Sequence, residues 1–314
     1  MDILIDKENA GKNIRTLLRT DMGYSSGMLK KLKFSEGGIL VNGEFKTVRY
    51  ELKEGDVLSI ACEDTDGDVS PYIIPFKLDI GIAYEDTHLT VVNKPHNMPS
   101  HPSFGHRDDT VANALAYRYN GEPYVFRPVN RLDRDTSGLM ICARTRLAAY
   151  KLYKSMVNSE IRKVYIAILE HCPKESFGTI KTYVNRCDDS IVKRKICEAS
   201  ENGAKEAITA YKTLFSTDKY TVVAASPITG RTHQLRLHFS HIGCPIVGDT
   251  MYGSESSEID RHALHAAALR FPHPESGEIL NVIAGLPADM KKLIASEKTI
   301  TENELTSLFE YLGL

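Results

Sequence analysis

Between residues 78 and 285 the chain alternates short strand-like runs with helical stretches, and this order constrains the fold more than any other feature. The strand-like runs cover residues 89–92, 139–142, 164–168, 220–224 and 279–284, and the helical stretches cover residues 111–116 and 147–156. These elements lack the regular strand–helix–strand cadence of a doubly wound parallel sheet. We therefore predict an α+β domain, placed at residues 76–295.

The first 62 residues predict a smaller unit of their own. An amphipathic pattern predicts a helix at residues 11–20, and serines suited to an N-cap precede a short basic helix at residues 25–33. A strand at residues 39–41 enters the Asn-Gly pair at residues 42–43, which is typical of a tight hairpin turn. A closing strand ends near residue 60.

Charge is unevenly distributed along this unit. From residue 12 to residue 49 there are eight basic and three acidic residues, although the whole chain has a net charge of −2. A local basic patch favours nucleic-acid contact, and a solvated helix face is the alternative. An acidic, turn-rich segment follows at residues 63–75 and is predicted to be a solvated linker. Residues 296–314 predict a short helical tail.

The order of elements in this unit resembles the S4 RNA-binding domain. The resemblance rests on two short helices, then G-x-L-V-N-G, then E-G-D-x-L, over roughly residues 12–60. In that domain the basic helix and the following turn lie against the RNA backbone. The resemblance therefore implies RNA contacts for Lys30, Lys31 and Lys33.

The densest group of charged residues is the segment PVNRLDRDTSGL at residues 128–139. Two arginines alternate with two aspartates, and Thr-Ser-Gly then leads into an apolar strand. A surface ion-pair ladder would explain this alternation, whereas carboxylates on a loop entering a buried strand favour a functional cleft.

A second segment, TGRTHQLRLH at residues 229–238, crowds cationic and donor groups together. Its alternating leucines predict a strand with one apolar face, serving as an anion site or as plain structure. The histidine pairs HFSH and HALH have a spacing that suits a metal, but hydrogen-bonded structural roles are favoured because no nearby ligand completes a set.

Several blocks, in order across about residues 80–287, resemble the large-subunit rRNA pseudouridine synthases of the RluA family. They are Asn93-Lys94-Pro95, NRLDRDTSGL, Lys163-Val164-Tyr165 with Ala167, GRTHQLRLH, and Leu264-His265-Ala266 with Phe271 and His273-Pro274. The resemblance implies a mixed, largely antiparallel sheet with flanking helices. It also implies an enzyme that isomerises uridine in RNA, most often 23S rRNA or its precursor, without a cofactor or a metal.

The resemblance further implies a role for each matching residue. Asp133 is the essential carboxylate, which attacks the sugar or the base or removes a ribose proton, and Arg231 is the cation that pairs with it. Tyr165 packs against the target base, Leu235 or Leu237 supplies an apolar wall, and Arg131 enters the gap left by the flipped base.

Two positions depart from the family pattern: Asn130 replaces a histidine, and Asn97 stands where a glycine is usual. Asparagine tolerates the left-handed conformation, so we expect the turn at residue 97 to persist. The departure at residue 130 supports one alternative, a catalytically silent RNA-binding or ribosome-assembly factor. A glycoside hydrolase using Asp133 with Asp135 is another, although no second carboxylate block is recognisable.

The sequence shows no long apolar run. The start of the chain carries acidic residues, and no stretch approaches the ~18 apolar residues that a membrane span needs. We therefore expect a cytoplasmic protein without a signal peptide or membrane contact. A monomer is the default expectation.

Overall fold

The computed structural model describes residues 2–22, 24, 26–35, 37–61, 68–188, 190, 192–294 and 300–312. The strands are β1 (Asp2–Leu4), β2 (Ile39–Val41), β3 (Glu44–Phe45), β4 (Val57–Ile60), β5 (Gly81–Glu85), β6 (Leu89–Lys94), β7 (Arg127–Pro128), β8 (Ser137–Ala143), β9 (Arg162–Leu169), β10 (Phe177–Arg186), β11 (Arg194–Cys197), β12 (Lys205–Ser216), β13 (Thr221–Pro227), β14 (Leu264–Pro272) and β15 (Ile279–Ile283). The helices are α1 (Ile14–Thr16), the π-helical η1 (Leu17–Asp21), α2 (Ser26–Phe34), α3 (Val111–Arg118), α4 (Arg146–Val157), α5 (Gln234–His241), α6 (Ala288–Leu293) and α7 (Glu302–Tyr311).

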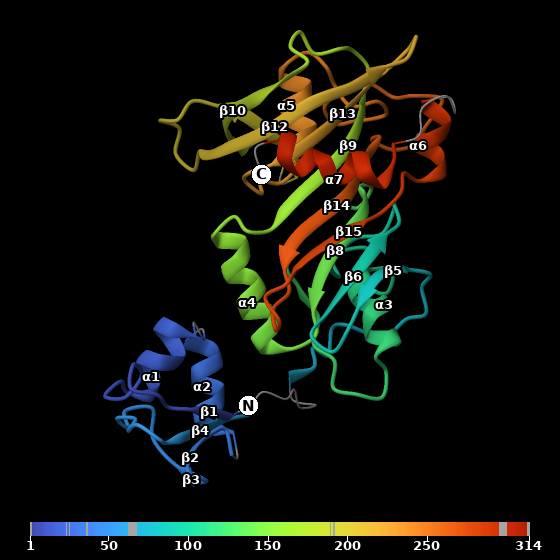
Figure 1. The fold of residues 1–314 in the computed structure, drawn as a ribbon. Coiled ribbons are helices and arrows are strands. Elements are labelled where there is room, and N and C mark those ends of the chain that lie inside the picture. Colours follow the sequence, from blue (N-terminus) through green and yellow to red (C-terminus); the bar gives the residue numbers. More distant parts are fainter. Residues whose placement is uncertain are drawn as a thin grey trace.

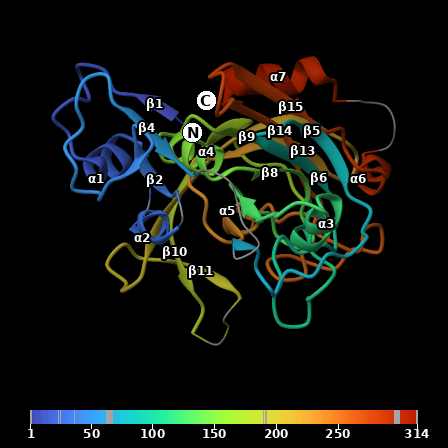
Figure 2. The ribbon, with the colours of Figure 1, turned by 90° about the horizontal axis from the view of Figure 1, so that it is seen from below.

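The N-terminal unit is a four-stranded antiparallel sheet in the order β1-β4-β2-β3, with a hydrophobic core of its own. The predicted hairpin turn forms, since Asn42 and Gly43 both have positive φ, 52° and 81°. The carboxylate of Asp56 fixes the turns around it, because it accepts hydrogen bonds from Asn42 Nδ2 at 2.8 Å and from Lys53 N at 2.9 Å. Figures 1 and 2 show this unit as a separate body beside the larger sheet.

The larger sheet has eleven strands, and its main path runs β11-β10-β12-β13-β9-β14-β8-β6-β5. Every strand pair within the described residues is antiparallel except β14 with β8. The sheet is therefore mixed and largely antiparallel, and the α+β prediction is confirmed.

Strand β8 is an interior strand of this sheet, between β14 and β6, and is buried on both faces. Leu139 and Ile141 belong to one hydrophobic cluster, which also contains Leu152 of α4. Met140 belongs to the other cluster, which contains Leu115 of α3. Because successive side chains of a strand point to opposite faces, α3 and α4 cover opposite sides of the sheet here, as Figure 1 shows.

The described part of the segment after the N-terminal unit, from residue 68 onward, is only partly solvated. Residues 62–67 of the predicted linker lie outside the described residues, but Asp68 forms ion pairs with Lys31 of α2 and with Arg146 of α4. The Asp68 side chain is only 8% exposed, so the expectation of a fully solvated acidic linker is wrong at this residue. The ion pairs join the N-terminal unit to the first turn of α4.

The C-terminal helix α7 packs against the main sheet. Its apolar residues Leu305, Leu308 and Phe309 are buried in the same core cluster as Val164 and Ile166 of β9. Among the described residues, no helix has both the length and the apolar character that crossing a membrane requires.

Gly138 allows β8 to approach β14 very closely. Its φ is +110°, and a Cβ at this position would lie 2.3 Å from the carbonyl oxygen of Ala266. A side chain here would therefore push the two strands apart at their parallel pairing.

We expect Gly138→Ala to lower the free energy of unfolding by about 2 kcal/mol or more, because both the positive φ and the collision disfavour alanine. Gly285→Ala is the matched control, since nothing lies within 4 Å of its Cβ position. Urea denaturation of both variants tests this, and equal effects would contradict the packing argument.

Candidate active site

The loop that carries Asp133 is fixed by the residues that follow it. Thr136 Oγ1 lies 2.8 Å from His262 Nε2, and Ser137 Oγ lies 2.9 Å from His265 Nδ1. Burial lowers the pKa of both histidines to about 4, so both rings are neutral near pH 7. Thr136 and Ser137 therefore attach the loop to the beginning of β14 and to the residues just before it.

Lys94 fixes the same loop from the other side. Its side chain is fully buried, and Nζ donates to the carbonyl oxygens of Pro95, Met98 and Arg134 at 2.8–2.9 Å. Burial lowers the pKa of Lys94 to about 7. Because Arg134 follows Asp133 directly, these hydrogen bonds tie the carboxylate loop to the turn after β6.

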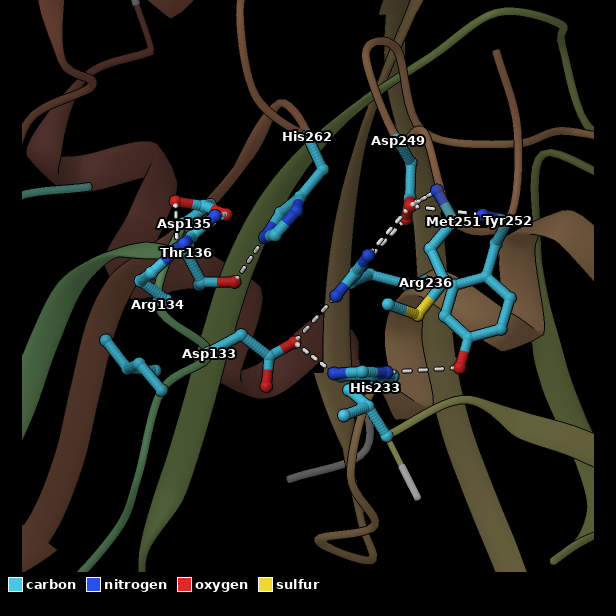
Figure 3. A network of polar contacts seen from close by, with 12 residues as sticks. Asp133, Arg134, Asp135, Thr136, His233, Arg236, Asp249, Met251, Tyr252 and His262 are labelled. Atoms are coloured by element: carbon cyan, nitrogen blue, oxygen red, sulfur yellow. Dashed lines mark hydrogen bonds and ion pairs between the residues drawn. The ribbon is translucent and has the colours of Figure 1, made fainter. Parts of the chain in front are cut away.

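The Asp133 carboxylate faces a buried guanidinium (Figure 3). Arg236 Nη1 lies 3.4 Å from Asp133 Oδ2, and Arg236 Nε and Nη2 bind Asp249 at 2.7 and 2.8 Å. The Asp249 carboxylate also accepts the backbone amides of Met251 and Tyr252. Asp249 thus binds the Arg236 guanidinium through two hydrogen bonds and orients its Nη1 toward Asp133.

A histidine also approaches Asp133. His233 Nε2 lies 3.9 Å from Asp133 Oδ2, and the residue has the left-handed backbone conformation with φ 57°. Burial lowers the pKa of His233. Asp133 therefore faces one permanent cation and one imidazole.

The predicted pairing of Arg231 with Asp133 is wrong. Arg231 Nε donates instead to the carbonyl oxygen of Glu206 in β12 at 2.9 Å, and its backbone amide donates to Gln234 Oε1. The predicted strand at residues 229–238 is also wrong, because residues 234–241 form helix α5. The helix directs Arg236 toward Asp133, whereas Arg231 lies in the segment before the helix begins.

Asp133 lines a cavity of about 360 Å³, a size typical of small-ligand sites. Four other predicted site residues line it: Tyr165, Arg131, Leu235 and Arg231, the last without contacting Asp133. Burial raises the pKa of the Tyr165 hydroxyl, so this phenol is neutral near pH 7. Leu237 does not line this cavity, but packs with Val184 and Ala207 on another side of α5.

Most ring nitrogens of the buried histidines in the HFSH and HALH segments lie within hydrogen-bond distance of a hydroxyl or a carbonyl group. His238 lies between Thr182 Oγ1 and Thr209 Oγ1, at 3.0 and 2.9 Å, and His265 also contacts the carbonyl oxygen of Ala284. Within the described ranges, no group of three or more histidine, cysteine or acidic side chains is arranged to hold a metal ion.

Both departures from the family pattern keep the local backbone in place, although the buried Nδ2 of Asn130 has no hydrogen-bond partner among the described residues. Asn130 Oδ1 accepts the backbone amide of Ile141 at 2.8 Å, so this side chain supports the loop against β8. Asn97 has φ 57°, which confirms that asparagine maintains the left-handed turn. Arg134 and Asp135 form a partly exposed ion pair, so the ion-pair ladder interpretation holds for these two residues alone.

Sequence analysis assigned no catalytic role to five residues at this site: Lys163, His233, Arg236, Asp249 and Tyr252. Lys163 lines the cavity two residues before Tyr165 on β9, and burial lowers its pKa. Asp249 and Tyr252 lie in the segment GDTMYG, whose glycine at residue 248 has φ +74° and abuts the carbonyl oxygen of Arg261. The two glycines that flank this aspartate and tyrosine were the sequence signal that could have indicated a tight, functional turn here.

Comparison with known proteins shows which family this chain resembles. The family model for RNA pseudouridylate synthase matches residues 88–241. The uncharacterized RNA pseudouridine synthase YjbO of Bacillus subtilis is 37% identical over 279 residues, covering 88% of this chain and 96% of that relative. The chain belongs to the RNA pseudouridine synthase family. Its members are isomerases, so the prediction of a pseudouridine synthase is confirmed.

Two further members of the RNA pseudouridine synthase family support the assignment. Ribosomal large subunit pseudouridine synthase D of Buchnera aphidicola is 30% identical over 304 residues, covering 91% of this chain and 94% of the relative. The solved structure of human RNA pseudouridylate synthase domain containing 1 matches with a TM-score of 0.58 at 28% identity, covering 75% of this chain and 95% of the human chain.

The two arginines of this pseudouridine synthase family member can be separated by experiment. We expect Arg236→Lys to lower kcat for pseudouridine formation by about 100-fold, because lysine cannot bind Asp249 at two points and face Asp133 as well. Arg231→Lys should change kcat by less than about tenfold, because Arg231 does not contact the carboxylate. Equal losses of kcat, with unchanged thermal melts, would contradict this assignment.

Proposed function

We propose that the protein converts uridine to pseudouridine in large-subunit rRNA, with Asp133 as the catalytic carboxylate. In this isomerisation the bond from C1′ to N1 breaks, the uracil rotates, and a bond from C1′ to C5 forms. C5 loses a proton and N1 gains one, so the reaction needs no oxidant or reductant. The observation that carries the proposal is a cavity with the Asp133 carboxylate in its wall, 3.4 Å from a fixed guanidinium.

The wall of the cavity supplies the other groups that this reaction needs. Tyr165 offers an aromatic face for a flipped base, and Leu235 adds an apolar wall. Arg131 is exposed at the rim, where a planar guanidinium can occupy the space that the flipped base leaves in the RNA stack. Base flipping costs a few kcal/mol, which these contacts offset.

Two observations favour rRNA as the substrate class. Relatives that are 30% or more identical include ribosomal large subunit pseudouridine synthase D from several bacteria, and the Buchnera protein covers most of this chain. The N-terminal unit carries a basic helix in front of the isomerase domain. An rRNA substrate implies a cytoplasmic site of action.

The proposal extends to the N-terminal unit, which we infer to be an S4-like RNA-binding domain. Lys30 and Lys33 are one turn apart on the exposed side of α2, opposite the buried Leu29 and Leu32. Lys31 is also exposed but pairs with Asp68. The lysine pair at residues 30 and 33 therefore faces solvent on one side, which suits contact with an RNA backbone.

The catalytically silent alternative receives no support from residue 130. Its sequence argument was the asparagine in place of a histidine, yet Asn130 holds the loop to β8 by the hydrogen bond from Ile141. The glycoside hydrolase alternative requires Asp135 beside Asp133, but Asp135 pairs with Arg134 and is not among the residues that line the cavity.

We expect Asp133→Asn to abolish pseudouridine formation while the melting temperature and RNA affinity stay close to those of the wild type, because asparagine keeps the volume but cannot carry the charge. Pseudouridine mapping of total RNA, from cells that lack the gene and are complemented with either form, measures this. The position restored by the wild type alone identifies the substrate. Restoration by Asp133→Asn would refute the catalytic role.

We expect Lys30→Ala with Lys33→Ala to weaken RNA binding and to reduce the slope of log affinity against log salt by about 2. Lys291→Ala with Lys292→Ala, on exposed positions of α6, is the matched control with the same loss of charge. Filter binding of substrate RNA at several salt concentrations tests this, and identical slopes for the two double variants would contradict the S4-like role.

A further inference from the structure

The tautomer of His233 is determined by a chain of hydrogen bonds that begins at β11. The backbone amide of Arg194 donates to the hydroxyl oxygen of Tyr252 at 2.8 Å, and the same oxygen lies 3.1 Å from His233 Nδ1 (Figure 3). An amide can only donate, so the Tyr252 oxygen is the acceptor in the first contact. A phenol oxygen can accept two hydrogen bonds, so the first contact alone does not fix the direction of the second. Among the described residues, however, His233 Nδ1 is the one acceptor within hydrogen-bond distance of the Tyr252 hydroxyl hydrogen, and donation to Nδ1 is the arrangement that satisfies it.

The other side of the ring selects the same tautomer. His233 Nε2 lies 3.9 Å from Asp133 Oδ2. A neutral imidazole carries hydrogen on one nitrogen only, so an acceptor at Nδ1 places the hydrogen on Nε2, where it faces the carboxylate. The opposite tautomer would direct a lone pair of Nε2 at a negative oxygen and leave the Tyr252 hydroxyl hydrogen without this partner.

We propose that Tyr252 is a positioning residue for the isomerisation, because its hydroxyl locks His233 with an N–H directed at Asp133. Tyr252 is not among the residues that line the cavity, so it acts on the reaction only through His233. Its contribution to the rate rests on the proposed function, whereas its effect on the tautomer does not.

The surroundings of His233 keep the ring neutral, as the proposal requires. The charged side chains around the ring are those of Asp133, Arg236, Arg194 and Asp249. Burial, the largest influence, lowers the pKa of His233. The hydroxyl of Tyr252 acts in the same direction, since a donor at Nδ1 stabilises the neutral ring and opposes its protonation.

Tyr252→Phe tests the proposal, because it removes one oxygen and keeps the ring that packs at 5.7 Å from the His233 ring and 5.3 Å from the Arg236 guanidinium. Nitrogen-15 NMR of the full-length protein without RNA reports the tautomer. We expect hydrogen on Nε2 in the wild type, and a mixture of tautomers with a raised His233 pKa in the variant. Hydrogen on Nδ1 in the wild type would overturn the proposal.

Kinetics provide the second measurement. We expect Tyr252→Phe to lower kcat about tenfold without changing KM for RNA, and to have no further effect in a His233→Asn background. Asparagine suits that background because it tolerates the positive φ of residue 233. Tyr220→Phe is the control, since its hydroxyl bonds Glu258 away from the cavity.

The kinetic outcomes are equally decisive. An unchanged kcat in Tyr252→Phe, or an equal loss in the His233→Asn background, would overturn the positioning role. An inactive wild type would count against the proposed function alone, because the NMR measurement tests the lock without any substrate.

Discussion

The candidate active site depends on one guanidinium, that of Arg236, which faces two carboxylates. Arg236 is buried, bound to Asp249 at two points and directed at Asp133. A buried cation is stable only when its charge is balanced and its N–H groups have acceptors. Asp249 balances the charge of Arg236 and accepts two of its hydrogen bonds, while also accepting two backbone amides. These hydrogen bonds with Asp249 let Arg236 face Asp133 without rearranging, which is the preorganisation that electrostatic catalysis requires. Helix α5, the GDTMYG segment and the Asp133 loop therefore meet at this ion.

Like Arg236, the loop that carries Asp133 is held in place by several buried contacts. Thr136 and Ser137 bind histidines that precede or begin β14, Gly138 lets the two strands touch, and Lys94 binds the loop carbonyl from the turn after β6. Each of these polar groups is buried, so breaking one of the contacts would leave a donor or acceptor unpaired. The carboxylate is consequently displayed on a loop whose position is fixed by the central sheet.

Much of the fold could be predicted from local pattern. Short apolar, strand-like runs predicted β6, β8, β9, β13 and β15, and the Asn-Gly pair predicted the first hairpin. Helix α5 was mistaken for a strand because its leucines alternate over a short stretch. Leu235, Arg236, Leu237 and His238 are all buried, so no polar face reveals the helical period. The wrong choice between Arg231 and Arg236 follows from that error, since only the helix directs residue 236 inward.

The sequence by itself determined that a carboxylate lies on a loop entering a buried strand, because composition and apolar runs are local properties of the chain. It also determined the family, through blocks whose residues match one by one. Only the tertiary structure decided which cation faces Asp133, that Asp249 and Tyr252 belong to the site, and that Leu237 does not. The contact between Arg236 and Asp133 joins residues 103 positions apart in the sequence, whereas Arg236 and Asp249 are 13 positions apart and His233 and Tyr252 are 19. The distances in space are set by strand order and by the direction of α5, which no local pattern encodes.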